Sequence, residues 1–206
     1  SKGGTRYNFD STNIYASTNA INSLYTVKQY YEGKLGDFSK EEFLQSLISD
    51  FNGHEDIRAK CKNVTKFGKL NSHANDLMTC VFDEIMAQRC YRGNDKQPGR
   101  FMPALILWIT WITCGERVGA TPDGRKLGQP TADSCGPMQG TDTEGPTSVM
   151  GAALSLNQEK CAGTCILNLR LDSANFKTKE GTEKVQKLFE AYFMQCGSQL
   201  QVNVVD

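Results

Sequence analysis

The chain has 206 residues, of which 39% are hydrophobic and 22% are charged, and this composition excludes an intrinsically disordered protein. Lysine plus arginine and aspartate plus glutamate number 23 each, so the chain lacks the basic excess that binding to a nucleic-acid backbone requires. The length suits one domain or a large piece of one.

The sequence carries no signal for export or for a membrane. The longest apolar stretch, residues 101–112, is too short to cross a bilayer as a helix, and the chain opens on polar residues rather than on the apolar segment of a signal peptide. Its eight cysteines are irregularly spaced, which is not typical of a disulfide framework in a secreted protein. We therefore expect a cytoplasmic protein with reduced thiols, in an anaerobic environment, that binds neither nucleic acid nor membrane.

The first half of the chain, residues 17–92, is predicted to be helical. Apolar residues recur at three- and four-residue spacing in 17–32 and in 71–91, which is the pattern of a helix with one buried face. Between these two stretches, Ser39 and Glu42 form a capping-box pattern that predicts the start of a further helix.

The second half of the chain, residues 101–206, mixes strands, a long loop and helices. Residues 101–113 are rich in isoleucine, tryptophan and threonine without a polar face at helical spacing, so they predict a strand buried on both sides. Residues 115–147 hold seven glycines and four of the six prolines and predict a loop, which at this length is most often functional or disordered. A helix, a strand, a helix and a strand are then expected over 146–157, 163–171, 179–195 and 199–205. This alternation predicts an α/β fold with a partly parallel sheet.

No motif, read from the residue types alone, indicates a particular reaction. The two histidines, His54 and His73, are far apart and have no further ligands at metal-site spacing, so a metal site and a Ser–His–carboxylate triad both lack support. Cys161 and Cys165 could form a metal or redox pair. Because no second pair completes four ligands, we interpret them as structural thiols.

The long loop resembles the signature segment of the glycyl radical enzymes of the pyruvate formate-lyase type. Residues 119–125 are Gly-Ala-Thr-Pro-Asp-Gly-Arg, and residues 136–147 follow the family's Ser-Pro-x-x-Gly-x-Asp-x-x-Gly-Pro-Thr at family spacing, with Gly136 where serine is usual. Residues 3–8 and 201–206 also resemble family segments, so the likeness extends from end to end. The shared loop residues are expected to brace the loop rather than to react, and they are Thr121, Pro122, Asp123, Gly124, Arg125, Asp142, Gly145, Pro146 and Thr147.

The resemblance implies a ten-stranded α/β barrel made of two half-barrels, of which this chain would supply a C-terminal portion. Members of the family use a backbone glycyl radical to oxidise a cysteine, and the thiyl radical then abstracts hydrogen from a small substrate. The parent protein would be a lyase, dehydratase, decarboxylase or acyltransferase. Its radical would be installed by a radical S-adenosylmethionine activating enzyme, and the protein would form a homo-oligomer.

In family order the reactive cysteine precedes Ser1 and the radical glycine follows Asp206. We therefore expect this chain to lack the glycyl radical segment, to hold no catalytic residue, metal or cofactor, and to depend on the remaining barrel and radical segment of its parent. Cys114-x-Glu116 has the family's Cys-x-Glu form, but it lies directly before the 119–125 run, so no catalytic role is transferred to it. Two other interpretations stay open: a non-catalytic scaffold or assembly subunit derived from the fold, and a thiol-dependent or metal-binding protein.

By resemblance, a cavity lined by strands would enclose the substrate and exclude water. The candidates for contact with the substrate are apolar residues on two predicted strands, namely Trp108, Trp111, Ile112, Leu167 and Leu169. Side chains alternate along a strand, so residues of only one parity can face a cavity. Packing against outer helices is an equally open role for each of them.

Overall fold

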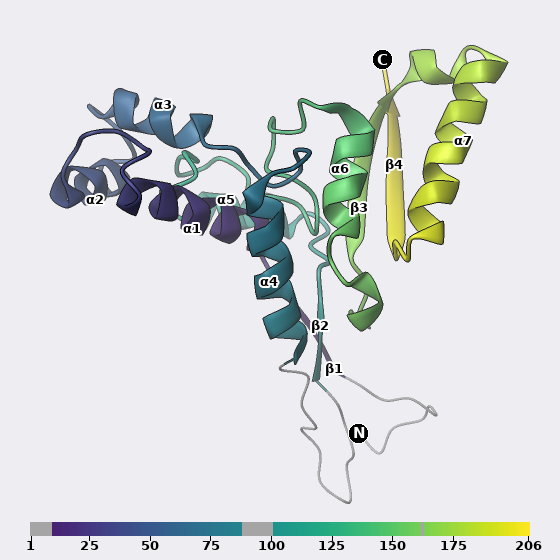
Figure 1. Ribbon diagram of the computed structural model, residues 1–206, viewed down its shortest axis with the longest axis horizontal. Helices are drawn as coiled ribbons and strands as arrows, with labels where there is room; N and C mark the ends of the chain where they lie inside the picture. The colour runs from purple at the N-terminus through teal and green to yellow at the C-terminus, as the bar shows by residue number, and fades with distance from the viewer. Residues whose placement is uncertain (1–9, 88–100, 162) are drawn as a thin grey trace, which may run out of the picture.

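The computed structural model describes residues 10–87, 101–161 and 163–206, which form a group of helices beside a set of parallel strands (Figure 1). The family-like segment 3–8 and the predicted helix end at 88–91 lie outside these residues. Within the described residues, no helix combines the length and the apolar character that crossing a membrane requires.

Three helices gather at one end of the molecule: α1 (Ser17–Tyr31), α2 (Lys40–Ile48) and α3 (Glu55–Asn63) (Figure 1). The predicted capping box at the start of α2 is confirmed, because Glu42 N donates to Ser39 Oγ at 3.1 Å and Ser39 N donates to Glu42 Oε2 at 2.7 Å. A small apolar core holds these helices together, and its buried members are Leu35, Phe43, Phe51, Ile57 and Cys61.

Helix α4 (His73–Ala87) connects this end of the molecule to the strands (Figure 1). It confirms the helix predicted over 71–91 in the described part of its length. Met78, Phe82 and Met86 recur every four residues on its buried face and belong to the main core of the molecule. The stripe expected from the sequence, Leu77, Val81 and Ile85, is only partly buried beside this face.

Four strands in the described part of the chain pair in two parallel ladders. β1 (Asp10–Asn13) pairs with β2 (Phe101–Ala104), and β3 (Ile166–Asp172) pairs with β4 (Gln199–Val205). One parallel bridge, between Leu105 and Cys165, connects the two ladders. The predicted α/β arrangement with parallel strands is confirmed.

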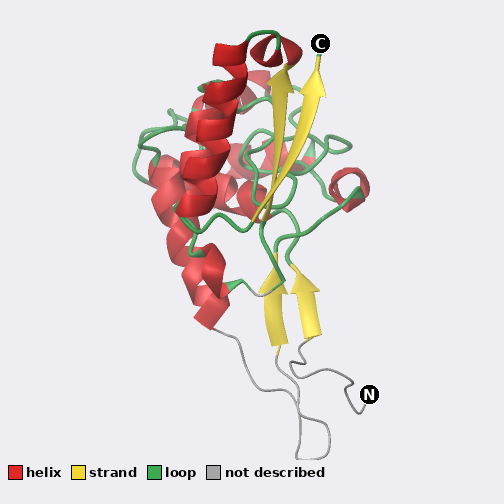
Figure 2. Cartoon of the chain, turned by 90° about the vertical axis from the view of Figure 1, so that its right-hand side faces the viewer, coloured by secondary structure: helices red, strands yellow, loops and turns green. Residues whose placement is uncertain are grey.

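Two helices flank β3 and β4, namely α6 (Gly145–Leu154) and α7 (Lys179–Met194) (Figures 1 and 2). α6 begins with Pro146 in its first turn, and α7 begins after Thr178, whose hydroxyl accepts from Gly181 N at 3.0 Å. Two short 3₁₀ helices, η1 and η2, span Gln158–Lys160 and Ser173–Phe176. Since α7 connects β3 to the parallel strand β4, these elements form a β–α–β unit.

The predicted strand over 101–113 is wrong beyond residue 105. β2 ends at Ala104, and Trp108 takes a left-handed backbone conformation with φ 50°. Thr110–Arg117 then form the helix α5. Aromatic and β-branched side chains favour a strand only weakly, so contacts with distant residues can override that preference.

Contacts with the following loop hold α5 in place. A Cβ on Gly115 would lie 2.2 Å from Gln129 O, so only glycine allows the loop to approach this helix so closely. The Arg125 guanidinium donates to the carbonyl of Gly115 at 3.3 Å and to that of Val118 at 2.8 Å. The carbonyl of Val118 at the helix end thereby gains a donor, and that of Gly115, which also accepts from Gly128 N at 3.0 Å, gains a second one.

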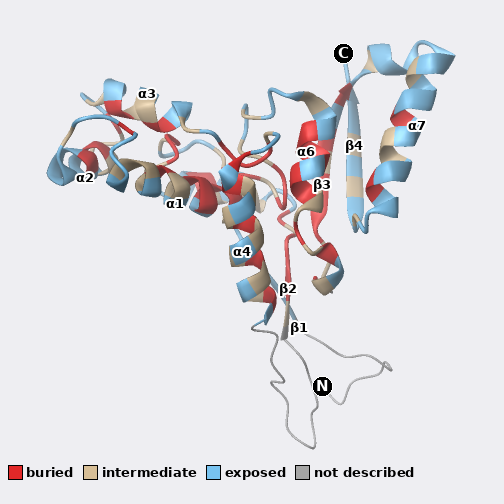
Figure 3. Cartoon of the chain, in the orientation of Figure 1, coloured by how far each residue is buried: buried red, intermediate tan, exposed pale blue. Residues whose placement is uncertain are grey.

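Burial differs sharply between the two strands of the second ladder. Leu167, Leu169 and Leu171 on β3 are buried, whereas β4 is mostly exposed along its length (Figure 3). β3 therefore belongs to the core, with α6 packed on it, and β4 forms an edge of the described strands.

Candidate functional site

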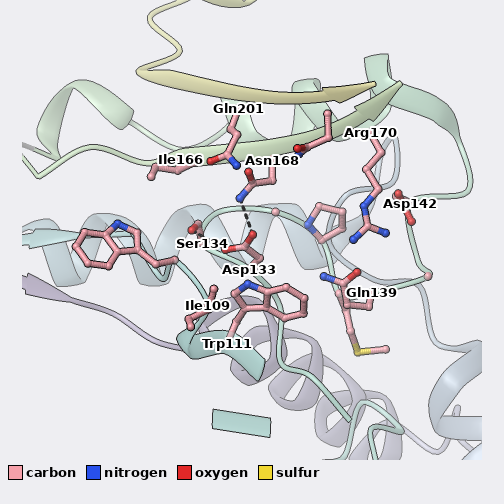
Figure 4. A pocket seen from close by; sticks show the side chains of 16 residues that line it. Ile109, Trp111, Asp133, Ser134, Gln139, Asp142, Ile166, Asn168, Arg170 and Gln201 are labelled. Atoms are coloured by element: carbon pink, nitrogen blue, oxygen red, sulfur yellow. Dashed lines mark hydrogen bonds between the residues drawn. The ribbon is translucent and has the colours of Figure 1, made fainter. Parts of the chain in front are cut away.

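A cavity of about 600 Å³ lies between the 131–142 loop, the start of α5 and one face of β3 and β4 (Figure 4). Its lining residues are Trp108, Ile109, Trp111, Asp133, Ser134, Gly136, Pro137, Met138, Gln139, Gly140, Asp142, Ile166, Asn168, Arg170, Gln201 and Asn203. The volume suits a small molecule. The strand wall is polar apart from Ile166, and the α5 side is aromatic and aliphatic.

The alternation of side chains along β3 separates the core from the cavity. Leu167 and Leu169 belong to the main core, whereas Asn168 and Arg170 line the cavity. In the parallel register Asn168 pairs with Gln201, and Arg170 pairs with Asn203. Four polar residues on neighbouring strands thus form one continuous wall.

Asp133, on the 131–142 loop, is held against this wall by two side chains. Its Oδ2 accepts from Asn168 Nδ2 at 2.5 Å, and its Oδ1 accepts from Ser134 Oγ at 2.9 Å (Figure 4). Ser134 Oγ in turn accepts from the main-chain nitrogen of Leu107 at 3.2 Å. Burial raises the pKa of Asp133 above its ordinary value, although the two hydrogen bonds and the charge of Arg170 oppose that rise.

Asn168 lines the cavity with an incomplete set of hydrogen bonds. Its amide nitrogen donates to Asp133, but its Oδ1 is buried and has no hydrogen-bond partner within the described structure. A carboxylate oxygen can only accept, so the nitrogen rather than the oxygen of this amide must face Asp133. The site therefore contains a buried acceptor that the described part of the chain leaves without a donor.

Helix α1 anchors the 131–136 part of the loop that lines the cavity opposite β3 and β4. Asn19 Oδ1 accepts from Ala132 N at 2.6 Å, and Thr18 Oγ1 donates to the carbonyl of Gly136 at 2.8 Å. Both α1 residues are buried. The 131–136 part of the predicted loop is thus attached to the helical group on one side and faces the strands on the other.

The prediction that Asp123 and Arg125 brace the loop is consistent with their contacts. Asp123 accepts from Asn19 Nδ2 at 2.6 Å, from Thr121 Oγ1 at 2.5 Å and from Arg125 N at 3.2 Å. The Arg125 guanidinium donates to five main-chain carbonyls, those of Gly115, Val118, Gly119, Lys126 and Gln129. Both side chains are buried, and burial lowers the pKa of Arg125 while Asp123 opposes that shift.

The other loop residues singled out from the sequence lie in two places. Asp142 lines the cavity, while Gly145, Pro146 and Thr147 form the first turn of α6. Pro122 and Gly124 belong to the turn between Thr121 and Arg125, in which Gly124 N donates to the carbonyl of Thr121 at 2.9 Å and Gly124 has φ 92°. Glycine favours that left-handed conformation.

The predicted substrate-contact residues are not brought together. Trp108 and Trp111 line the cavity, but from the turn before α5 and from α5 itself rather than from a strand. Ile112 is outside the lining and is 41% exposed, and Leu167 and Leu169 pack in the core. The sequence analysis did not single out Asn168 and Arg170, the polar residues of β3 that face the cavity. Leucine alternates with asparagine and arginine over 167–171, and this pattern predicts one apolar and one polar face of the strand.

Within residues 10–87, 101–161 and 163–206, the histidines and cysteines do not assemble into a metal site. Among the residues that the structure describes, no group of three or more His, Cys, Asp or Glu side chains could hold an ion. His73 pairs with Asp76 at 3.2 Å on the surface. A hydrogen bond between the side chains of Cys161 and Cys165 lowers the pKa of Cys161 and raises that of Cys165.

Two family models match the chain. One, for pyruvate formate lyase-like proteins, matches residues 1–110, and the other, for the glycine radical domain, matches residues 131–206. The chain belongs to the glycyl radical enzyme family. The β3–β4 face and the 131–142 loop of the cavity lie within the part that matches the glycine radical model.

The relatives of this glycyl radical enzyme chain include several dehydratases. It is 28% identical over 210 residues to trans-4-hydroxy-L-proline dehydratase of Clostridioides difficile, with 100% of this chain and 26% of that protein covered. It is 28% identical over 215 residues to the probable dehydratase YbiW of Escherichia coli strain K12, with 99% and 26% covered. The chain thus spans about a quarter of the length of these relatives.

A solved structure of the family has the same fold over this segment. The glycerol-bound B12-independent glycerol dehydratase from Clostridium butyricum is similar with a TM-score of 0.90 and 29% identity, covering 100% of this chain and 26% of that one. The hydroxyproline dehydratase of Clostridioides difficile with its bound substrate gives a TM-score of 0.87 and 26% identity, covering 100% and 26%. The chain is therefore an α/β piece that corresponds to about a quarter of a glycyl radical enzyme.

The prediction that this chain lacks the glycyl radical segment is wrong, because residues 131–206 match the glycine radical domain. The prediction that this segment has no part in carrying the radical cofactor is wrong for the same reason. That expectation placed the radical glycine beyond Asp206. The domain match includes α6, β3, α7 and β4.

Proposed function

We propose that this chain forms part of the substrate chamber of a dehydratase that removes water from a small hydroxylated molecule by thiyl-radical hydrogen abstraction. The observation that carries the proposal is the polar cavity wall of β3 and β4, which lies within the glycine radical domain. The names of relatives matched over the whole of this chain support dehydration as the reaction class.

The residues of this chain would bind and orient the substrate. The glycyl radical supplies, through a cysteine, the abstraction of hydrogen from a substrate carbon. The amides of Asn168, Gln201 and Asn203 each offer donors and an acceptor to substrate hydroxyl groups. Trp108 and Trp111 form an apolar wall opposite, which limits the access of water to a reactive carbon.

The parent protein is proposed to complete a ten-stranded barrel around this chamber. β4 is an edge strand in the described structure, with Val204 53% and Val205 45% exposed. On α7, Phe193 and Met194 are 51% and 84% exposed. An open strand edge and exposed apolar side chains favour coverage by further protein. The proposed partners are the remaining barrel, the activating enzyme and further copies of the chain.

The decisive experiment uses the full-length protein, produced without oxygen and treated with a radical S-adenosylmethionine activating enzyme. Electron paramagnetic resonance would measure the glycyl radical. Aldehyde or imine formation would then be measured with glycerol, propane-1,2-diol and trans-4-hydroxy-L-proline. We expect a radical signal, and loss of water from at least one of these substrates.

Two results would overturn this function. A protein that acquires the radical but dehydrates none of the hydroxylated substrates would be a member with another reaction. A full-length protein that acquires no radical from any competent activating enzyme would favour a non-catalytic scaffold.

A double variant, Asn168→Ala with Asn203→Ala, should retain the radical signal and lose turnover, because the proposed role of both residues is to bind substrate.

A further inference from the structure

We propose that the cavity selects a substrate that carries both a hydroxyl and an anionic group, with the hydroxyl bound at Asn168 and the anionic group at Arg170. This inference rests on the proposed function and specifies the substrate class of the same cavity. It depends on three features of the wall: a buried acceptor without a donor, a carboxylate that orients it, and a guanidinium two residues farther along β3.

The acceptor is Asn168 Oδ1. It is buried, and within the described residues it receives no hydrogen bond, although Asn168 lines the cavity. A buried acceptor is destabilising unless a donor reaches it. The atom exposes less than 1 Å² of surface, so a hydroxyl of a ligand in the cavity would supply that donor once a neighbouring side chain moves aside.

Asp133 is the positioning residue of the pair. By accepting from Asn168 Nδ2 it turns Oδ1 away from itself and fixes which end of the amide remains for a ligand. Ser134 Oγ holds the other carboxylate oxygen, and the neighbouring Ala132 is anchored to α1 through Asn19. The amide is therefore oriented before any ligand binds, which lowers the entropy cost of binding.

Arg170 lies on the same face of β3 as Asn168, two residues on. Because a strand rises about 3.3 Å per residue, their main chains are about 6.6 Å apart. Chains of three or four carbons can join a hydroxyl and a charged group across that spacing, with one hydrogen bond at each end. Arg170 is exposed, and within the described part of the chain no carboxylate lies within 4.0 Å of it as an ion-pair partner.

A guanidinium in this position favours a carboxylate, sulfonate or phosphate, because its planar fork of donors matches their oxygen atoms. Two carboxylates of the lining compete with an anionic ligand: that of Asp133, whose pKa burial raises and the charge of Arg170 lowers, and that of Asp142. Asp142 lies on the loop side of the cavity, near the end of the wall where Arg170 projects (Figure 4). Its carboxylate repels an anionic ligand, so its removal should change affinity in the opposite direction to removal of Arg170.

The test measures binding to the full-length protein before activation, so that no radical or turnover is needed. Three small probes separate the two interactions: glycerate has hydroxyls and a carboxylate, glycerol has hydroxyls only, and propionate has a carboxylate only. We expect glycerate to bind at least tenfold more tightly than either of the others in titration calorimetry.

Four variants assign the contributions. Arg170→Gln should lower glycerate affinity about tenfold and leave glycerol unchanged, while Asp142→Asn should leave glycerate affinity unchanged or raise it. Asn168→Ala should weaken glycerate and glycerol alike and spare propionate. Asp133→Asn should weaken the same two probes, because it frees the amide of Asn168 to rotate. If Asn168→Ala does not fold, Asn168→Ser, which keeps a small polar side chain, takes its place.

The inference is overturned if glycerate does not bind, if glycerol binds as tightly as glycerate, or if Arg170→Gln leaves glycerate affinity unchanged. These results are distinguishable from failure of the proposed function. A protein that prefers glycerate but never dehydrates a substrate contradicts only the dehydratase assignment. An active dehydratase without that preference contradicts only the selection of an anionic hydroxylated substrate.

Discussion

Two regions of the molecule contain similar polar residues but differ in how far those residues are hydrogen-bonded by the protein itself. One is the turn around Asp123 and Arg125, and the other is the cavity wall around Asn168 and Arg170. In the turn, the carboxylate accepts three hydrogen bonds and the guanidinium donates to five main-chain carbonyls. In the wall, an amide oxygen has no partner within the described structure and the guanidinium of Arg170 is exposed. Polar groups satisfied by their own chain stabilise the fold, whereas unsatisfied ones in a cavity are available to a ligand.

The largest expected effect is that of Arg125→Ala. It removes the side-chain donor from five carbonyls, of which those of Gly115 and Lys126 keep a main-chain donor, and it removes one of the two cations near Asp123, the other being Lys66, so we expect a loss of about 3–5 kcal/mol in the free energy of unfolding. Urea denaturation of the full-length protein measures it. Arg170→Ala is the matched control and should cost no more than about 0.5 kcal/mol, as a typical surface change does. Equal losses at the two arginines would remove the distinction between the two regions.

The next effect is that of Gly115→Ala, at the contact between α5 and the braced loop. The added Cβ would lie 2.2 Å from Gln129 O, and relieving that overlap should cost about 1–3 kcal/mol despite the better helix propensity of alanine. Gly119→Ala is the control, since a Cβ there meets no atom within 4 Å and should change the melting temperature little. If the Gly115→Ala protein were as stable as the Gly119→Ala protein, the close contact between Gly115 and Gln129 would not be needed to hold α5 in place.

A smaller effect concerns pH and the cavity wall. Burial raises the pKa of Asp133 above 3.8, so the folded protein favours the protonated carboxyl more than the unfolded chain does. The favourable contribution is therefore present below the ordinary value and is lost as pH rises through the raised value. The unfolding free energy of the wild type should fall relative to that of Asp133→Asn between pH 4 and pH 7. A difference that stays constant or grows with pH would contradict this assignment.

The smallest expected effect is that of Asn168→Ala on stability in the absence of ligand. The substitution removes a hydrogen bond to Asp133 but also removes a buried acceptor without a donor, so we expect the two changes nearly to cancel, with a net change below about 1 kcal/mol. Thermal unfolding without and with glycerate measures it. The stabilisation by glycerate should be smaller in the variant, because the contact of the glycerate carboxylate with Arg170 remains. A loss of several kcal/mol without ligand would place Asn168 among the structural residues instead.

Sequence reasoning succeeded where the decisive interactions are local. Two examples are the capping box of Ser39 and Glu42 and the position of Pro146 in the first turn of α6, which depend on residues only a few positions apart. The resemblance of the 119–147 loop to the family signature also correctly indicated the glycyl radical enzymes.

Sequence reasoning failed where distant contacts decide. Residues 105–113 have a composition typical of a strand, but the Gly115–Gln129 approach and the Arg125 hydrogen bonds hold Thr110–Arg117 as a helix. Leu167 and Leu169 were expected as cavity candidates because they are apolar. The structure uses them in the core and directs the intervening polar residues to the cavity.

The sequence by itself determined the capped helices, the parallel α/β alternation and the family, because each depends on short-range geometry or on a contiguous motif. Only the tertiary structure decided which of the alternating side chains of β3 face the cavity and which of the described polar atoms remain without a hydrogen-bond partner. Burial and hydrogen-bond satisfaction depend on residues such as Asn168 and Asp133, which lie 35 positions apart and meet only when the chain has folded.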